Sequence, residues 1–276
     1  MRKKSARIDA LRKSMSSFPD IAPPSSWLLA SEVRVFWEVW AGIAMYAPVK
    51  QIVPKGDGHP VLVLPGLGAS DVSTALLRQF IDDLGYVSYP WELGRNKGFK
   101  EETHNAIEER LDAIHDEHRR PVSLIGQSLG GVYARELAKL APHKVRQVIT
   151  LGSPFSGHPL ATSGIRLYEW LSGDNIEDLD FDRHHEIRET PPVPTTSVYS
   201  KLDGVVAWQC SIEKGHRQSE NIHLRGATHC GMASSPAALY LLADRLSQTP
   251  QTWKPFAPRG AARVFYGIGD HQDDAR

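Results

Sequence analysis

Apolar and polar residues alternate regularly from residue 60 onward, where short apolar runs are separated by longer segments with apolar residues at helical spacing. Val61–Leu64 is a continuous apolar run that ends at Pro65-Gly66, as is typical of a buried strand. The helix that we predict next has one apolar face and ends at Gly85. Further strands are predicted at residues 86–89, 122–125, 145–151, 196–199 and 222–224, and further helices at 101–118, 129–140 and 236–246. This alternation predicts an α/β fold, a mostly parallel sheet flanked by helices.

One long segment interrupts the alternation, between the strand predicted to end near Leu151 and the strand predicted to begin at Thr196. A loop of that length without secondary structure is unusual in a compact domain, so we expect helices within it. Residues 154–194 are therefore predicted to form a small helical cap, or lid, over the edge of the sheet. A surface excursion without a gating role is the alternative.

Residues 1–58 precede the alternating pattern, and we expect them to form an N-terminal helical extension that packs on the core. Their most apolar stretch, Trp27–Ala47, contains three charged residues and is too polar for a transmembrane span. On a helix its polar positions form a narrow stripe and its apolar positions a broad side. The stripe consists of Ser31, Arg34, Glu38 and Gly42, and the apolar side includes Val33, Phe36, Trp37 and Trp40. A helix buried against the domain is the simplest interpretation. A homodimer contact and a lipid-facing helix at a membrane surface, formed by residues 27–47, are the alternatives, since clustered tryptophan suits an interface.

The composition of the chain narrows the classes of function. The 276 residues include 32 basic and 32 acidic ones, and this zero net charge argues against nucleic acid as a partner. Arg2, Lys3 and Lys4 are not followed by an apolar run, so no secretory signal is predicted. We expect a cytoplasmic protein with at most peripheral membrane contact. The only cysteines are Cys210 and Cys230, too few for a four-cysteine zinc site.

The most informative motif is Gly126-Gln127-Ser128-Leu129-Gly130-Gly131, which fits the pattern G-x-S-x-G. It lies directly after a predicted buried strand and opens a predicted helix. In that setting a sharp strand-to-helix turn holds the serine in a strained conformation, and larger residues at Gly126 and Gly130 would clash. We therefore predict that Ser128 is a catalytic nucleophile.

A serine nucleophile needs a base, because its hydroxyl is almost wholly protonated at neutral pH. The chain order nucleophile, acid, base is typical of this motif. Asp203 follows a predicted strand and precedes a glycine, so it is the candidate acid, with a simple turn former as the alternative. His229 lies just past the last predicted strand and is the candidate base. The other histidines after Asp203 are interpreted as solvated or packed residues: His216, His223 and His271.

These motifs give the chain a resemblance to the α/β-hydrolase superfamily, specifically to its bacterial lipase and carboxylesterase-like branch. The resemblance covers roughly residues 59–246. Besides the segments of the three candidate catalytic residues, it includes Leu64-Pro65-Gly66-Leu67-Gly68 and Gly152–Gly157. It implies an oxyanion hole formed by the backbone amides of Leu67 and Leu129. Lipases usually have His-Gly where this chain has Pro65-Gly66, a departure that changes how the loop is held.

The resemblance also implies an α/β-hydrolase core made of residues 59–153 and 195–248, followed by a C-terminal tail at 249–276. We predict a carboxylesterase or lipase that cleaves short- to medium-chain acyl esters, with lipids among the candidates, through an acyl-serine. No metal or organic cofactor is expected. The candidate pocket walls are Trp91, Phe155, Leu167, Tyr168 and Trp170. An acyltransferase with the same triad and a non-catalytic binding protein are the alternatives.

Cys210 lies between the candidate acid and the candidate base in the sequence, and Cys230 directly follows the candidate base. A Cys210–Cys230 disulfide would tie the acid and base loops together, as in some secreted lipases that the chain resembles. In a reducing cytoplasm two free thiols are the default. Both states remain open at this point.

Overall fold

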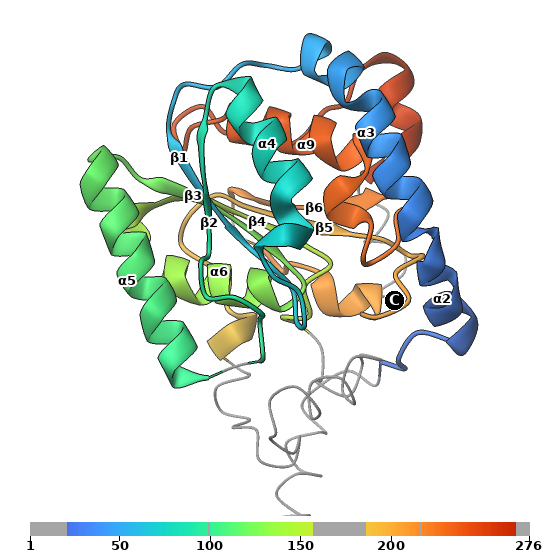
Figure 1. Cartoon of the computed structure of the whole chain (residues 1–276), viewed down its shortest axis with the longest axis horizontal. Helices are drawn as coiled ribbons and strands as arrows, with labels where there is room; N and C mark the ends of the chain where they lie inside the picture. Colours follow the sequence, from blue (N-terminus) through green and yellow to red (C-terminus); the bar gives the residue numbers. More distant parts are fainter. Residues whose placement is uncertain (1–20, 99, 157–185, 216, 269–276) are drawn as a thin grey trace, which may run out of the picture.

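A seven-stranded sheet forms the centre of the molecule (Figure 1). The computed structural model describes residues 21–98, 100–156, 186–215 and 217–268, and within these the strand order is β2-β1-β3-β4-β5-β6-β7. The strands are β1 Pro60–Leu64, β2 Val87–Pro90, β3 Val122–Gln127, β4 Val145–Leu151, β5 Thr195–Tyr199, β6 Ser219–Leu224 and β7 Tyr266–Ile268. Strands β1 to β6 are parallel to their neighbours, and β7 is antiparallel to β6. The predicted α/β fold class is confirmed.

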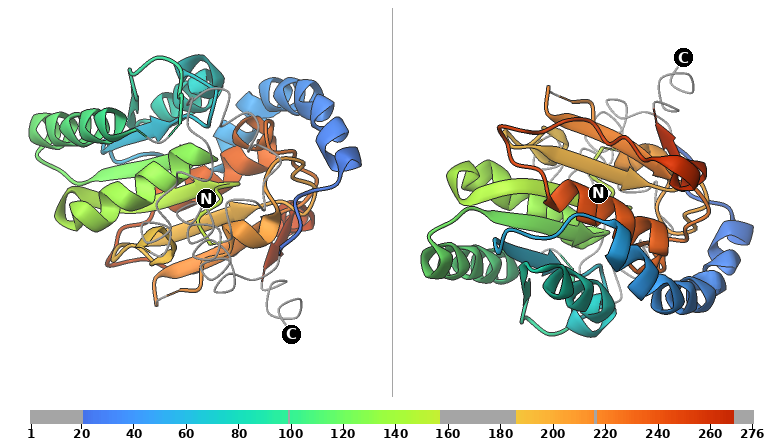
Figure 2. Two further views of the ribbon diagram at one scale, coloured as in Figure 1. Left: turned by 90° about the horizontal axis from the view of Figure 1, so that it is seen from below. Right: turned by 90° about the horizontal axis from the view of Figure 1, so that it is seen from above.

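Helices cover both faces of the sheet (Figure 2). They are α3 Val35–Ile52, α4 Ala75–Leu84, α5 Glu101–His118, α6 Leu129–Leu140 and α9 Pro236–Leu246. Because side chains alternate along a strand, β1 contributes to two apolar layers. Val61 and Val63 pack with residues of α3, α4 and α9, whereas Leu62 and Leu64 pack with residues of α5 and α6.

Several short helices connect these elements. One is the six-residue α-helix α2, Ser26–Ser31. The others are 3-10 helices: η1 Glu32–Arg34, η2 Asp71–Thr74, η3 Pro142–Lys144, η6 Trp208–Ser211, η7 Met232–Ser234 and η8 Gly260–Phe265. The parallel strands bring their carboxyl ends to one edge of the sheet, where the β3–α6 turn, the loop after β5 and the loop after β6 meet.

The interpretation of the N-terminal helix as buried by its apolar side is wrong. Trp37 is 77% exposed and Trp40 is 69% exposed, whereas Gly42 of the polar stripe is buried. A Cβ atom at Gly42 would lie 2.0 Å from the carbonyl oxygen of Ser234, so this position permits close packing on the domain. The periodicity distinguishes two faces but does not say which one faces the protein. None of the helices in the described ranges is long and apolar enough to cross a bilayer.

The segment after α9, expected to be a tail, adds β7 to the sheet. Tyr266 of this strand is buried, and its ring packs edge-on against Phe256 with 4.8 Å between the ring centres. A three-residue strand with glycine at its centre has no recognisable apolar alternation, which is why the sequence pattern did not predict it.

Candidate active site

Ser128 occupies the turn between β3 and α6 with φ 51° and ψ −124°, a backbone conformation that is rare for a residue with a side chain. Two glycines make the turn possible. A Cβ atom at Gly126 would lie 2.3 Å from the carbonyl oxygen of Gly130, and one at Gly130 would lie 2.2 Å from that of Leu64. The Ser128 amide donates to the carbonyl of Leu151 across a distance of 2.8 Å. The serine is thus held in a strained turn, as expected for a nucleophile in this motif.

Asp203 and His229 are in direct contact. Asp203 follows β5, His229 follows β6, and His229 Nδ1 lies 2.7 Å from Asp203 Oδ2. The other carboxylate oxygen, Oδ1, accepts hydrogen bonds from the amides of Val205 and Val206 at 2.8 and 2.7 Å. Since the carboxylate only accepts hydrogen bonds, it fixes the proton of the imidazole on Nδ1 and leaves Nε2 free to take another.

The pKa of His229 is raised above its ordinary value of 6.5. Burial of the ring alone lowers the pKa, but the charge of Asp203, its hydrogen bond to the ring and the charge of Glu32 together outweigh burial. The protonated ring, which forms when a base removes a serine proton, is therefore stabilised in this setting.

The serine turn lies next to the acid–base pair. Gln127, the residue before Ser128, donates from Nε2 to the carbonyl oxygen of His229 at 3.1 Å. Gly152, which follows the strand that binds the Ser128 amide, faces the pair, because a Cβ atom there would lie 3.0 Å from Asp203 Oδ2 and 3.2 Å from His229 Nδ1. The three predicted triad residues thus all lie at the carboxyl edge of the sheet, although Ser128 and His229 are 101 positions apart in the sequence.

The loop after β1 lies against the serine. A Cβ atom at Gly66 would lie 3.1 Å from Ser128 Cβ, so the adjacent Leu67 is beside the nucleophile. Within the described ranges the amides of Leu67 and Leu129 donate to no protein acceptor, which leaves both available to an oxyanion. The arrangement is compatible with the predicted oxyanion hole.

Asn96, which sequence reasoning missed, holds this loop. It is fully buried, and its side-chain Nδ2 donates to the carbonyl of Pro65 at 2.9 Å. Its backbone accepts from the amide of Gly68 and donates to the carbonyl of Ala69, both at 2.8 Å. Asn96 therefore fixes the loop that departs from the His-Gly pattern. No local motif around this asparagine would have identified it.

Trp91, a predicted pocket residue, does not line a pocket in the structure. This side chain is 1% exposed, belongs to the apolar layer under α5 and α6, and donates from Nε1 to the carbonyl of Gly94. Phe155 is also 1% exposed and packs with Val132, Ile187 and the partly buried Leu129. The remaining predicted wall residues, Leu167, Tyr168 and Trp170, lie outside the described residues.

The suggested Cys210–Cys230 disulfide is not formed, since both residues are free cysteines. Cys210 is buried in a small cluster with Val206 and Ala207, while Cys230 is at the surface of the base loop. The loops that the disulfide would have joined are instead connected by the Asp203–His229 contact. Spacing in the sequence could not establish whether the two sulfur atoms approach one another.

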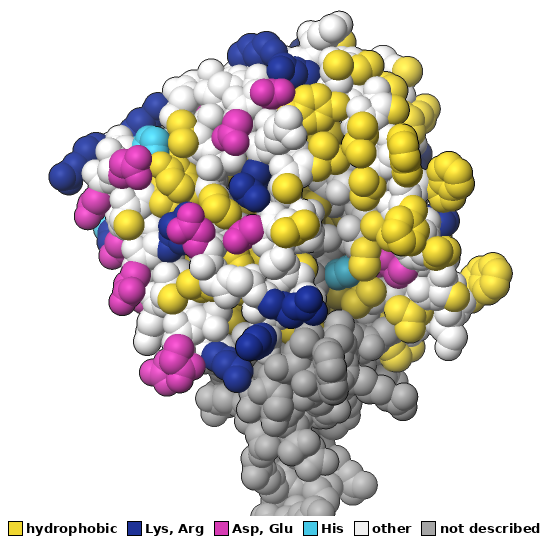
Figure 3. Space-filling model, in the orientation of Figure 1, with side chains coloured by type: hydrophobic (Ala, Val, Ile, Leu, Met, Phe, Trp, Pro, Cys, Tyr) yellow, Lys and Arg dark blue, Asp and Glu magenta, His cyan; other side chains and the backbone are white. Residues whose placement is uncertain are grey.

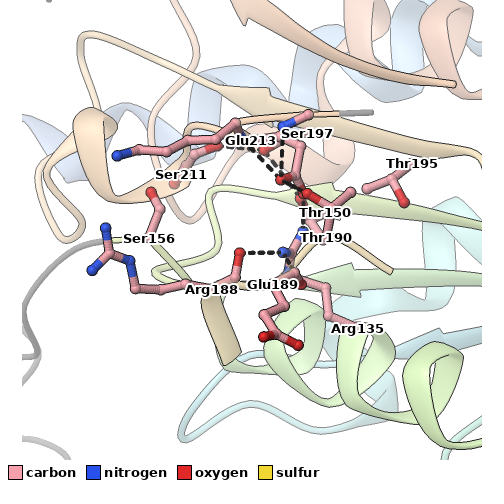
Figure 4. A network of polar contacts seen from close by, with 12 residues as sticks. Arg135, Thr150, Ser156, Arg188, Glu189, Thr190, Thr195, Ser197, Ser211 and Glu213 are labelled. Atoms are coloured by element: carbon pink, nitrogen blue, oxygen red, sulfur yellow. Dashed lines mark hydrogen bonds and ion pairs between the residues drawn. The ribbon is translucent and has the colours of Figure 1, made fainter. Parts of the chain in front are cut away.

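A buried ion pair lies beneath the ends of the predicted cap (Figure 4). Arg135 of α6 and Glu213 are 0% and 1% exposed and form an ion pair, and Arg135 Nη2 also donates to the carbonyl of Glu189 at 2.9 Å. Just before residues 157–185, Ser156 donates from its hydroxyl to the carbonyl of Gln209 and from its amide to the carbonyl of Cys210. Both ends of the segment are therefore anchored to the core, one at the loop of η6 and the other along α6.

The described part of the chain contains no group of three or more His, Cys, Asp or Glu side chains that could hold a metal ion.

Comparisons with known proteins agree with this architecture. The sequence model of a family described as "PGAP1-like alpha/beta domain" matches residues 99–211, less than half of the chain. Among solved structures, Aspergillus fumigatus lipase B is similar with a TM-score of 0.57 and 20% identity, over 75% of this chain and 56% of that one. The chain therefore spans little more than half of that lipase.

Bacillus licheniformis lipase BlEst2 in its mature form is similar with a TM-score of 0.54 and 16% identity, over 71% of this chain and 94% of that one. The comparison with curated proteins gave no match. The parallel sheet with its antiparallel edge strand, the strained serine turn after β3 and these likenesses together identify the chain as a protein of the α/β-hydrolase fold.

Proposed function

We propose that this protein is a serine hydrolase that cleaves carboxylic esters through an acyl-serine intermediate. The observation that carries the proposal is the buried His229–Asp203 contact of 2.7 Å beside the strained turn of Ser128. A non-catalytic binding protein would have no need to combine a strained serine with an oriented imidazole. The partly exposed apolar side chains of Leu67 and Leu129 favour esters with a short- to medium-length acyl chain.

In the proposed reaction, His229 Nε2 accepts the proton of Ser128 Oγ while Oγ attacks the ester carbonyl carbon. The carbonyl oxygen becomes an oxyanion that receives hydrogen bonds from the amides of Leu67 and Leu129, each contributing about 3 to 4 kcal/mol in comparable sites. The ester C–O bond then breaks, and His229 gives its proton to the departing alcohol. Water, deprotonated by His229, attacks the acyl-serine, which releases the carboxylic acid and restores Ser128.

Hydrolysis of p-nitrophenyl butyrate tests the proposal. Ser128→Ala should reduce kcat/KM at least about a thousandfold while the circular dichroism spectrum stays unchanged. Ser153→Ala is a matched control, because Ser153 is a neighbouring buried serine whose Oγ has no hydrogen-bond partner among the described residues. Activity that survives in Ser128→Ala would contradict the mechanism.

A series of p-nitrophenyl esters of increasing chain length locates the preferred acyl group. The fastest turnover is expected with short or medium chains. The acyltransferase alternative is tested by adding an alcohol acceptor and measuring how the acyl group divides between acceptor and water. Preferential transfer to the acceptor at low alcohol concentration would replace hydrolysis as the assigned reaction.

We further propose that the apolar face of α2 and α3 contacts a lipid surface. Figure 3 shows hydrophobic side chains gathered along this side of the molecule. The exposed members are Trp27, Leu29, Val33, Phe36, Trp37, Trp40, Ile43, Met45 and Ile52. An exposed apolar surface with this many large side chains is rare on a protein that binds no partner there, and tryptophan favours the boundary between lipid and water. Residues 1–20, which directly precede the face, carry six basic and two acidic side chains, a charge that suits anionic lipid.

Co-sedimentation with phosphatidylcholine vesicles, with and without phosphatidylglycerol, tests the lipid contact. The double variant Trp37→Ser/Trp40→Ser should lose at least about tenfold in affinity for the anionic vesicles. Val264→Ser, which removes an exposed apolar side chain from η8, should bind like the wild type. Equal binding by the double variant would contradict the proposal. So would a dimer that light scattering detects in the wild type and not in the double variant, because a second copy would then cover the face.

A further inference from the structure

One carboxylate outside the α/β core contacts both loops of the acid–base pair. Glu32 lies in η1, between α2 and α3, and its Oε1 accepts hydrogen bonds from the amide of Gly204 at 2.8 Å and from the amide of His229 at 2.9 Å. Its Oε2 accepts from the amide of Cys230 at 3.0 Å. Gly204 directly follows Asp203, so a single side chain connects the acid loop to the base loop.

The approach of the N-terminal helices to the acid loop is very close. A Cβ atom at Gly204 would lie 2.3 Å from the carbonyl oxygen of Leu28, the residue of α2 that packs on this loop. Only glycine leaves room for that contact. The hydrogen bonds of Glu32 are charge-assisted, a class roughly twice as strong as bonds between neutral groups. The acid loop therefore lets the N-terminal helices approach closely enough for Glu32 to bind its backbone.

Glu38 of α3 binds only the base loop. Its two carboxylate oxygens lie 3.0 and 3.1 Å from the amide of Thr228, the residue before His229. A Cβ atom at Gly231 would lie 2.1 Å from Glu38 Oε2, so the base loop also leaves room for a carboxylate. The hydrogen bonds of Glu38 reach the base loop alone, whereas those of Glu32 reach both loops.

The helix α3, which carries Glu38 and directly follows η1 with Glu32, is fixed to the domain at its other end. Val49 is buried in the apolar layer that α3 shares with α4 and α9. Tyr46 and Lys50 bind Asp83 of α4 at 2.8 and 3.0 Å. These contacts lie at the end of α3 away from Glu32 and do not involve the catalytic loops, so changing them leaves the hydrogen bonds of Glu32 in place.

We propose that Glu32 is a positioning residue that holds Asp203 and His229 in their reactive arrangement by binding the backbone of both loops at once. The proposal rests on the proposed ester hydrolysis. The N-terminal helices are then part of the catalytic apparatus, because they supply the group that sets the spacing of the acid and the base.

The kinetic test compares three variants with p-nitrophenyl butyrate as the substrate. Glu32→Gln keeps one of the two acceptor oxygens and replaces the other with an amide NH2 group, whereas Glu32→Ala removes both oxygens. Misplacement of catalytic groups by about 1 Å can cost a hundredfold in rate, so kcat should fall about tenfold in Glu32→Gln and up to about a hundredfold in Glu32→Ala. KM should stay within about twofold, since substrate contacts are untouched. Asp83→Asn, which loosens the far end of α3, should retain wild-type kcat.

The pH profile provides a readout that a loss of stability would not move. The charged and titratable groups around His229 are Asp203 from the acid loop, Glu32 and Glu38 from the N-terminal helices, and Cys230. Removing the negative charge of Glu32 favours the neutral imidazole. The acidic limb of kcat/KM should therefore move to lower pH in Glu32→Gln and stay in place in Asp83→Asn.

Nuclear magnetic resonance of the His229 Nδ1 proton follows the acid–base contact without any substrate. Its downfield resonance should shift or broaden in Glu32→Gln and remain unchanged in Asp83→Asn, with urea denaturation establishing that each variant is folded. An unchanged kcat and an unchanged resonance in folded Glu32→Gln would overturn the proposal, as would equal losses in Asp83→Asn. If the wild type neither hydrolyses the ester nor reacts with a fluorophosphonate at Ser128, the proposed hydrolysis fails, while the resonance still decides whether Glu32 sets the contact.

Discussion

Replacing Arg135 with methionine breaks the buried ion pair beneath the ends of the predicted cap. Arg135 and Glu213 are both almost fully buried, and the guanidinium also lies 3.7 Å from the centre of the Phe155 ring. Removing one partner of such a pair leaves an uncompensated buried charge and costs about 3 to 5 kcal/mol. Glu213 would keep its hydrogen bonds from Thr190 and from the amide of Lys214, so a loss near about 3 kcal/mol is expected.

Urea denaturation monitored by tryptophan fluorescence measures this loss. A decrease of about 3 kcal/mol corresponds to a drop of about 6 to 12 °C in Tm for a chain of this size. The double variant Arg135→Met/Glu213→Gln should recover at least about 1 kcal/mol, because it removes the buried charge and keeps the shape of Glu213. Lys144→Met, which breaks the more exposed pair with Asp112, should cost less than about 1 kcal/mol.

Two results would show that the cost does not come from an uncompensated buried charge. An Arg135→Met variant as stable as Lys144→Met would show that the pair is not desolvated. A double variant no more stable than Arg135→Met would show that lost packing on Phe155 is responsible for the cost and that the charge is not.

Three further predictions concern the serine turn, the base and the thiols. Gly130→Ala should lower the free energy of unfolding by at least about 2 kcal/mol in urea, because its Cβ would lie 2.2 Å from the Leu64 carbonyl oxygen; a wild-type value would contradict the geometry of the turn. The raised pKa of His229 means that the neutral base is lost as pH falls, so kcat/KM should decline with a midpoint above pH 6.5, and a midpoint below that value would exclude His229 as the base. The pKa of both thiols is raised to about 12, at Cys210 by burial and at Cys230, a surface residue, by partial burial of the thiol together with the charge of Glu32. Thiol titration should therefore detect two thiols in urea and slow reaction in the native state; a dithiothreitol-dependent Tm would instead indicate a disulfide.

The parts of the fold that the sequence predicted are those governed by local pattern. The apolar run at Val61–Leu64 forms most of the strand β1, because a strand that is buried on both faces of the sheet favours continuous apolar sequence. The G-x-S-x-G motif predicted a serine at a sharp turn, and Ser128 has the positive φ that such a turn requires. The catalytic roles of Ser128, Asp203 and His229 stay predictions until they are measured.

The features that sequence reasoning missed depend on contacts between distant segments. Glu32 is 172 positions from Gly204, and nothing in its neighbourhood indicates that it binds loop amides. The same contacts explain why the apolar side of α3 faces outward, because η1 and the inward face of α3 place the carboxylates of Glu32 and Glu38 on the amides of polar loops. The role of Asn96 was also not predictable from local sequence, because it depends on the hydrogen bond that its side chain donates to the distant Pro65 carbonyl.

The most direct test of the central claim is mass spectrometry of the intact protein and its peptides after incubation with a fluorophosphonate. We expect a single covalent adduct located on Ser128, formed more slowly as pH falls through the pKa of His229 and absent from Ser128→Ala. An unmodified wild-type protein, or an adduct that persists in Ser128→Ala, would contradict the assignment of Ser128 as an activated nucleophile.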